Sequence, residues 1–271
     1  MLNLHTNMSS ISAQRYLNNN STAMQDNISK LSSGFRINKA SDDAAGLAIS
    51  EEMRADIRSL KQASRNASDA VSLIQTSEAS MGEITNMLSR MRELAMQAAS
   101  DGINDTQRGY VNIEVNELVA EIDRIAGSAE YNGIPLLDGT LSATFQVGLD
   151  SGDTINFAVG TSLDSTGLGV NGIDLTTQAT ADAALANLDT AIESISSFRA
   201  TLGAKENRIN TVMSAISASS EALQAANSRI REVDVATEMA DFTKNQILVQ
   251  ASTSMLAQAN SYPEAALSLL G

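Results

Sequence analysis

Residues that commonly carry catalysis or bind metals are scarce in this chain. Its 271 residues include one histidine, His5, and no cysteine. A histidine-based triad, a histidine metal cluster, a thiol nucleophile and a disulfide are therefore excluded. No glycine-rich turn follows a predicted buried strand, as a phosphate-binding loop requires. We predict that the protein is not an enzyme and takes no cofactor or metal.

The segment Asp150-Ser151-Gly152-Asp153 looks like the start of a calcium loop, but the later ligands and the closing glutamate are missing. Residues 144–147 and 154–159 on either side alternate polar and apolar side chains, a period typical of strands. We interpret the segment as the turn of a small β-hairpin near residues 140–160. Residues 160–180 are rich in Gly, Ser and Thr, which predicts an irregular loop.

Charge and hydropathy exclude several classes of partner. The net charge of −14 argues against nucleic acid, which needs a basic face. No run of about 20 apolar residues is present, so we expect no membrane insertion. The first 30 residues lack the apolar core of a secretory signal. If the protein is secreted, we expect a route that leaves its N-terminus intact.

Long helices must position whatever surface the protein uses. Seven apolar residues recur at seven-residue steps, which predicts one long helix: Leu188, Ile195, Leu202, Ile209, Ile216, Leu223 and Ile230. An alanine-rich seam over residues 60–98 predicts a partner helix from about residue 42 to 100, and residues 104–129 carry a third amphipathic stripe. The pattern indicates a mainly α fold, with an elongated antiparallel long-helix bundle over residues 41–233. Three polar residues of the alternate register, Arg199, Glu206 and Asn227, are expected to face neighbouring copies.

Both ends of the chain predict amphipathic helices of low charge. Residues 1–40 carry a balance of +3 and residues 234–271 a balance of −3, so we expect these two segments to pair as a terminal helical domain. Pro263 is expected to interrupt the last helix, near residue 259. The apolar residues that we expect to form an inner coiled-coil layer are Leu4, Ile11, Leu17, Met24, Ile28, Leu31, Val235, Met239, Phe242, Val249 and Leu256.

Seams of this kind usually form only the core of a bundle. The position of these two helices distinguishes them, because chain ends commonly fray unless something holds them. Helices that are apolar and poorly charged at both ends are expected to be buried by a partner. The simplest partner is another copy of the same chain.

Four segments resemble the signatures of bacterial flagellins. Residues 31–50 (LSSGFRINKASDDAAGLAIS) are similar to the N-terminal signature of that family, and residues 91–98 (MRELAMQA) to its next block. Residues 228–234 (SRIREVD) and 255–260 (MLAQAN) resemble its C-terminal blocks. The resemblance covers about residues 1–140 and 183–265. Little chain separates the third helix from the long C-terminal helix, so this would be a short form without a large outer domain.

The resemblance implies a structural subunit that self-polymerises into the flagellar filament for motility. Such a subunit is secreted unfolded through the flagellar type III export apparatus. Its terminal helices then fold together on assembly and line the inside of the filament. The implied partners are further copies, the flagellar cap protein, the hook–filament junction protein and an export chaperone. The implied location is extracellular, in the bacterial flagellum.

The resemblance also implies a receptor surface. In many flagellins, an Arg and a Leu on the long helix and a Glu on the next helix are bound by an innate immune receptor of the host. Arg90, Leu94 and Glu114 occupy the matching places. The alternative is that Arg90 and Glu114 are ordinary solvated charges and that Leu94 packs between subunits. Both can hold, because the same surface of the family is an assembly contact.

Two other functions compete with a filament subunit. A hook–filament junction protein has similar ends but acts as an adaptor, and self-polymerisation into long filaments distinguishes the two. A surface adhesin or secreted coiled-coil effector would not need its first 33 residues for assembly. The continuous match over residues 32–50, together with the C-terminal block, favours the filament subunit.

Overall fold

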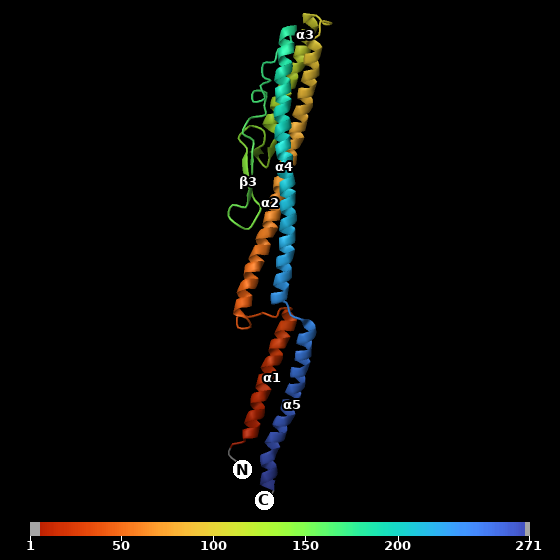
Figure 1. The fold of residues 1–271 in the computed structure, drawn as a ribbon. Coiled ribbons are helices and arrows are strands. Elements are labelled where there is room, and N and C mark those ends of the chain that lie inside the picture. The colour runs from red at the N-terminus through yellow and green to blue at the C-terminus, as the bar shows by residue number, and fades with distance from the viewer. Residues whose placement is uncertain (1–5, 269–271) are drawn as a thin grey trace. The chain divides into compact units, whose positions relative to one another are not determined.

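The computed structural model describes residues 6–268, with side chains for residues 6–261. Leu4 and His5 lie outside the described residues. The described part is mainly helical, as predicted, and its helices are α1 (Met8–Ser33), α2 (Ala44–Ala98), α3 (Asp105–Ser128), α4 (Gln178–Arg231) and α5 (Val235–Ser268) (Figure 1). None of these helices is long and apolar enough to cross a membrane.

The chain divides into two compact units. Unit 1 consists of residues up to 57 and from 221 onward, and unit 2 consists of residues 58–220. Both α2 and α4 contribute to each unit. The division that we expect within a filament, residues 1–40 with 234–271 against residues 41–233, concerns layers of a polymer and stays a prediction.

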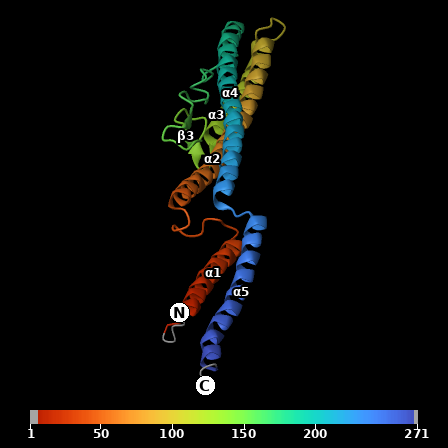
Figure 2. The same ribbon diagram turned by 60° about the horizontal axis from the view of Figure 1, so that its bottom comes forward.

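In unit 1, α1 and α5 lie side by side and antiparallel (Figures 1 and 2). α1 begins at Asn7, whose side chain accepts the Ser10 N–H at 3.1 Å. It ends at Gly34, which has a φ of +75° and donates its N–H to the Lys30 carbonyl at 2.9 Å. α5 begins after Asp234, whose carboxylate accepts the Ala236 N–H at 3.0 Å.

The prediction that Pro263 interrupts the last helix is wrong, because α5 continues to residue 268. A proline inside a helix leaves the carbonyl four residues earlier without its N–H partner. That carbonyl belongs to Ala259, and it accepts the side-chain amide of Asn7 from α1 at 2.7 Å. A donor from the neighbouring helix therefore replaces the missing backbone bond.

In unit 2, α2 packs against α4 along the predicted seams. The Arg92 guanidinium lies 2.6 Å from Asp189, and the Gln75 amide donates to Glu206 at 3.1 Å, so the two helices run antiparallel. Glu206 thus has a partner in its own chain, and Asn227, in unit 1, donates to the Ser50 carbonyl at 3.4 Å. Both residues are only partly buried, and their contact with neighbouring copies stays a prediction. The seam residues of unit 2 that are buried include Leu60, Ala67, Ile74, Met81, Leu88, Ala95, Leu188, Ile195, Leu202, Ile209 and Ile216.

The predicted hairpin is confirmed. β3 (Ser142–Gln146) pairs antiparallel with β4 (Thr154–Ala158), and residues 147–153 connect them. A shorter pair, β1 (Glu130–Tyr131) and β2 (Ile134–Pro135), was not predicted. Its turn consists of Asn132 and Gly133, which both have positive φ.

Residues 160–177 contain no regular strand or helix, yet they belong to the core of unit 2. Leu163, Val170 and Leu175 are fully buried. α3 holds this segment, since Asp123 accepts the N–H and hydroxyl of Ser165 at 2.7 and 2.9 Å. The loop is therefore a packed part of the fold.

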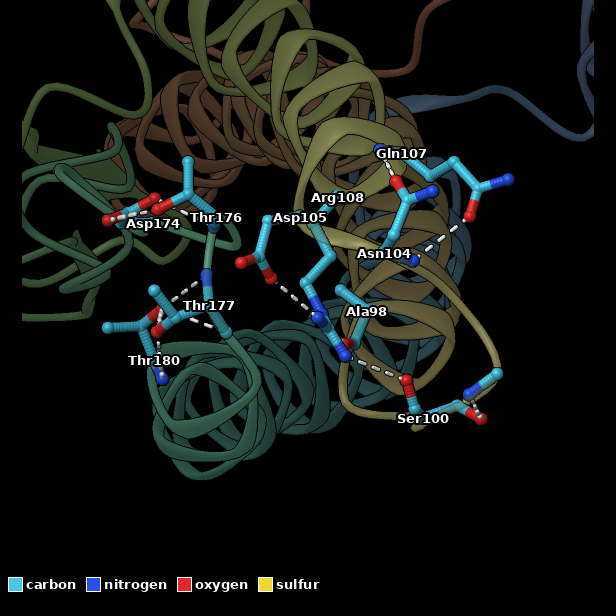
Figure 3. A network of polar contacts seen from close by, with 11 residues as sticks. Ala98, Ser100, Asn104, Asp105, Gln107, Arg108, Asp174, Thr176, Thr177 and Thr180 are labelled. Atoms are coloured by element: carbon cyan, nitrogen blue, oxygen red, sulfur yellow. Dashed lines mark hydrogen bonds and ion pairs between the residues drawn. The ribbon is translucent and has the colours of Figure 1, made fainter.

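The turn between α2 and α3 is closed by Arg108 (Figure 3). Its side chain is 8% exposed and donates to the carbonyls of Ala98 at 2.8 Å and Ser100 at 2.9 Å. The Ala98 carbonyl ends α2 and has no partner within the helix, and the Ser100 carbonyl lies in the turn that follows. Arg108 also forms an ion pair with Asp105 at 2.8 Å. The guanidinium of Arg108, which belongs to α3, thus provides hydrogen-bond donors at the end of α2. These bonds fix the position of the start of α3 relative to the end of α2.

We predict that Arg108→Ala lowers the free energy of unfolding by about 2 kcal/mol, because the carbonyl of the buried Ala98 and the carbonyl of Ser100 lose their donor. Arg124→Ala is the matched control, since Arg124 forms an exposed ion pair with Glu121 three residues away. The control should cost about 0.5 kcal/mol or less. Urea denaturation followed by circular dichroism measures both values, and equal losses in the two variants would contradict the role of Arg108.

Candidate functional site

The contact between α1 and α5 alternates apolar and polar positions. The less exposed residues of α5 are spaced four and three apart. Up to Leu256 they alternate between polar and apolar, and the last one is alanine: Glu238, Phe242, Asn245, Val249, Ser252, Leu256 and Ala259. The facing side of α1 follows the same rule: Leu17, Asn20, Met24, Asn27 and Leu31. Such a seam is apolar in only half of its layers.

The polar positions of the two helices pair with each other. Asn27 is 8% exposed; its amide nitrogen donates to Glu238, which is 9% exposed, and its oxygen accepts the Asn245 amide at 2.8 Å. Asn20 donates to the Ser252 hydroxyl at 3.2 Å. The pairs Asn20–Ser252 and Asn27–Asn245 share one antiparallel offset. Since an unpaired buried amide is costly, these layers fix the register of the two helices.

The predicted inner-layer residues separate into two groups. Those that line the α1–α5 contact are partly buried: Leu17, Met24, Leu31, Phe242, Val249 and Leu256. Those that remain exposed in the chain are Ile11, Ile28, Val235 and Met239. Leu4 lies outside the described residues. The sequence pattern did not separate the groups, because a heptad count does not show which side of a stripe meets the other helix.

Further exposed apolar residues of α1 and α5 were not singled out from the sequence. They are Met8, Tyr16, Ile247, Leu248 and Met255. Together with the four exposed residues of the predicted layer, they give the helix pair a large apolar surface in contact with water. We call these nine residues the outer apolar set. Exposed apolar residues that gather on one helix pair are typical of a contact with another molecule.

The loops next to α1 and α5 are tied together in unit 1. Phe35 and Glu232 form an isolated antiparallel β-bridge, and the Arg36 N–H donates to the Arg231 carbonyl at 2.7 Å. The Arg231 guanidinium lies 4.9 Å from the centre of the Phe35 ring and pairs with Glu51. The hydrogen bond from Arg231, followed by that from Arg54, lowers the pKa of Glu51 below its ordinary value. These contacts join the end of α1 to the start of α5.

The predicted receptor residues are only partly brought to one surface. The Arg90 guanidinium lies 2.9 Å from Glu114 of α3 and 3.1 Å from Glu93, and these acceptors raise its pKa above the ordinary value. Arg90 and Glu114 are both about half exposed. Leu94 is only 3% exposed and packs in the core of unit 2. Its side chain therefore presents almost no surface, and the role of the three residues stays a prediction.

Other residues of α3 are more accessible than Leu94. Tyr110 is 69% exposed and Ile113 is 60% exposed, and Ile113 directly precedes Glu114. The sequence contained a signal for them, because both interrupt the polar side of the α3 stripe. The surfaces that the described residues form are thus suited to packing and ion pairing. Within those residues, no group of three or more His, Asp or Glu side chains is arranged to hold a metal.

Comparison with known proteins gives consistent matches over both ends of the chain. The model of the bacterial flagellin N-terminal helical region matches residues 4–142, and that of the C-terminal helical region matches residues 185–270. The chain is 44% identical to a flagellar filament 33 kDa core protein of Treponema phagedenis, over 98% of this chain and 99% of the relative. It is 42% identical to the flagellin of Bacillus subtilis, over 99% and 100% of the two chains.

A solved structure agrees with this result. The crystal structure of Bacillus cereus flagellin superposes with a TM-score of 0.51 at 37% sequence identity. The match covers 56% of this chain and 88% of that chain.

We predict that, in the assembled protein, Asn27→Ala lowers the protection of α1 and α5 amides against hydrogen exchange by about tenfold, since Glu238 and Asn245 lose a buried partner worth about 1.4 kcal/mol. Asn19→Ala is the matched control, because Asn19 lies on the exposed side of α1. It should leave protection within about twofold. Equal protection in both variants would show that the polar layers do not hold the helix pair.

Proposed function

The chain belongs to the bacterial flagellin family, as a structural component of the flagellar filament and not an enzyme, and we propose that its copies join through the outer apolar set. The observation that carries this proposal is the exposure of nine apolar residues on α1 and α5. Covering them removes apolar surface from water, which is the main favourable term in association. The α1–α5 pair would then form the inner layer of the polymer.

Folding on assembly is supported by the composition of the α1–α5 contact. Half of its layers are polar, so burial of apolar area within the pair is modest. A helix pair of this kind gains much of its stability from a further partner. We propose that residues 1–40 and 234–271 stay largely unfolded during export and fold together when a subunit joins the filament. Residues 41–233 would form the layer around them, with no large outer domain.

The remaining partners follow from the family. We propose that an export chaperone covers the terminal segments before assembly, and that a cap protein and a hook–filament junction protein contact the ends of the polymer outside the cell. The relatives that are 42–44% identical to this chain are named flagellins or filament core proteins, and the similarity covers nearly their whole length. This favours the filament subunit over the junction adaptor, the adhesin and the secreted effector.

A second proposal concerns the Arg90–Glu114 ion pair. It is half exposed and joins α2 to α3, so it could present opposite charges side by side to a host receptor of the innate immune system. Leu94 would support this surface from the core and not contact the receptor directly. The proposal rests on the resemblance of these three positions to the receptor surface of other flagellins.

We predict that removing residues 1–33 abolishes polymerisation and leaves the helices of unit 2 folded. A finer variant, Ile11→Asp/Ile28→Asp, changes two exposed members of the outer apolar set and should act similarly, because it places charge in the proposed contact. Asn18→Asp/Asn19→Asp adds the same charge at exposed polar positions of α1 and serves as control. Electron microscopy scores filaments and circular dichroism scores helix content. Normal filaments from Ile11→Asp/Ile28→Asp would refute the proposed contact.

We predict that soluble monomer activates the flagellin receptor and that Arg90→Ala/Glu114→Ala lowers this activation by at least about tenfold, since a charge-assisted contact is lost. The control is Glu121→Ala/Arg124→Ala, which removes another exposed ion pair of α3. Receptor-dependent reporter cells measure the response. Undiminished activation by the Arg90 variant would exclude the ion pair from the receptor surface.

A further inference from the structure

Three basic residues of α2 have no acidic partner, although the chain is strongly acidic. Arg54, Arg90 and Arg92 of this helix all form ion pairs. The others, Arg58, Lys61 and Arg65, are exposed and pair with no carboxylate among the described residues. Steps of three and four place them on one face of the helix. We call these three residues the basic stripe.

A groove runs beside the basic stripe. It has a volume of about 410 Å³ and lies between α2, at Ser59, Gln62 and Asn66, and the hairpin tip, at Gly148 and Leu149. Asn66 donates to the Gln146 carbonyl at 2.9 Å, so the hairpin wall is anchored to the helix. Leu149 is an exposed apolar side chain at its edge. The groove is thus lined mainly by small and polar residues, with Leu149 as its exposed apolar member and the basic stripe next to it on α2.

The outer face of α3 has the complementary properties. Glu114, Glu117 and Glu121 follow each other at steps of three and four, the same spacing as the basic stripe. Glu117 has no ion pair within the described chain, and Glu114 uses only Oε1 to accept from Arg90. Tyr110 and Ile113, both strongly exposed, continue this face toward the start of α3.

A carboxylate that already has one arginine partner can accept a second. Glu51 shows this in the same chain, because it pairs with both Arg54 and Arg231. The internal ion pairs of Glu114 and Glu121 are therefore no obstacle to a further cation. The acidic surplus also lies in this part of the sequence, since residues 101–200 contain 15 acidic and 3 basic residues.

The two faces cannot meet within one copy. Glu114 contacts Arg90, and at about 1.5 Å per residue α2 separates Arg65 from Arg90 by roughly 37 Å. We propose that the outer face of α3 in one copy docks onto the basic stripe and groove of a second copy. The glutamates then pair with the stripe, and Tyr110 or Ile113 enters the groove beside Leu149. This contact rests on the proposed self-polymerisation and adds to the contact made by α1 and α5.

The first test reverses charge on the stripe of the full-length chain. Arg58→Glu/Arg65→Glu should raise the critical concentration for polymerisation at least about tenfold, because like charges then face each other across the contact. Arg208→Glu/Arg229→Glu changes the net charge equally at exposed positions of α4 and should stay within about twofold. Sedimentation of polymer measures both, and circular dichroism checks that the variants fold.

The second test exchanges the central charges of the two faces. Lys61→Glu alone should weaken polymerisation, and Lys61→Glu/Glu117→Lys should restore it to within about threefold of the wild type. The defect of the single variant should also shrink as salt rises from 0.05 to 0.5 M, since exposed charges are screened.

The outcomes separate this contact from the proposed function. If the unmodified chain forms no polymer, the proposed self-polymerisation fails. If it polymerises, and Arg58→Glu/Arg65→Glu has the same critical concentration as the control variant on α4, the docking of α3 onto the stripe is wrong. Arg58→Glu/Arg65→Glu could also keep the wild-type critical concentration but lose binding to heparin. That result would assign the stripe to an external polyanion and likewise overturn the proposal.

Discussion

Close packing of α2 against α4 is the constraint on which unit 2 depends. Ala67, Ala70 and Ile74 are fully buried, and side chains as small as alanine let the helix axes approach. The smaller elements are then attached by single polar anchors. Arg108 closes the turn to α3, Asn66 holds β3, and Lys205 donates to the Asn156 carbonyl of β4 while lying 5.3 Å from the Phe157 ring. These bonds to backbone carbonyls add to the apolar core that the elements share, which includes Val115 of α3 and Phe157 of β4.

Unit 1 is stabilised differently. Its helix pair uses buried amides and a carboxylate at alternate layers, so it gives up apolar contact within the chain for a defined register. The apolar residues that it does not use internally lie on the outside, in the outer apolar set. A helix pair with a fully apolar contact would be more stable alone, but it would also tolerate other registers. The observed composition suits a unit whose geometry matters more than its independent stability.

The seven-residue periodicity predicts the long helices well, because each apolar stripe must face a neighbour over its whole length. The hairpin is also predicted from local sequence, because polar and apolar side chains alternate on both sides of residues 150–153. Two features that the sequence did not predict depend on partners far along the chain. Asp123 orders the loop at Ser165, and Asn7 allows α5 to continue past Pro263. For the candidate site, Arg90 and Glu114 meet as the resemblance implies, whereas the burial of Leu94 depends on the core of unit 2.

The pairing of α1 with α5 also makes completeness of the chain a condition for correct folding. α1 finds its partner only in α5, and Asn27, Asn20 and Asn7 all bond to residues from position 238 onward. A product of interrupted translation keeps an α1 with unpaired amides and uncovered apolar side chains. Such a fragment cannot present the geometry of an intact subunit. The register of this helix pair can therefore form only in a chain that carries both α1 and α5.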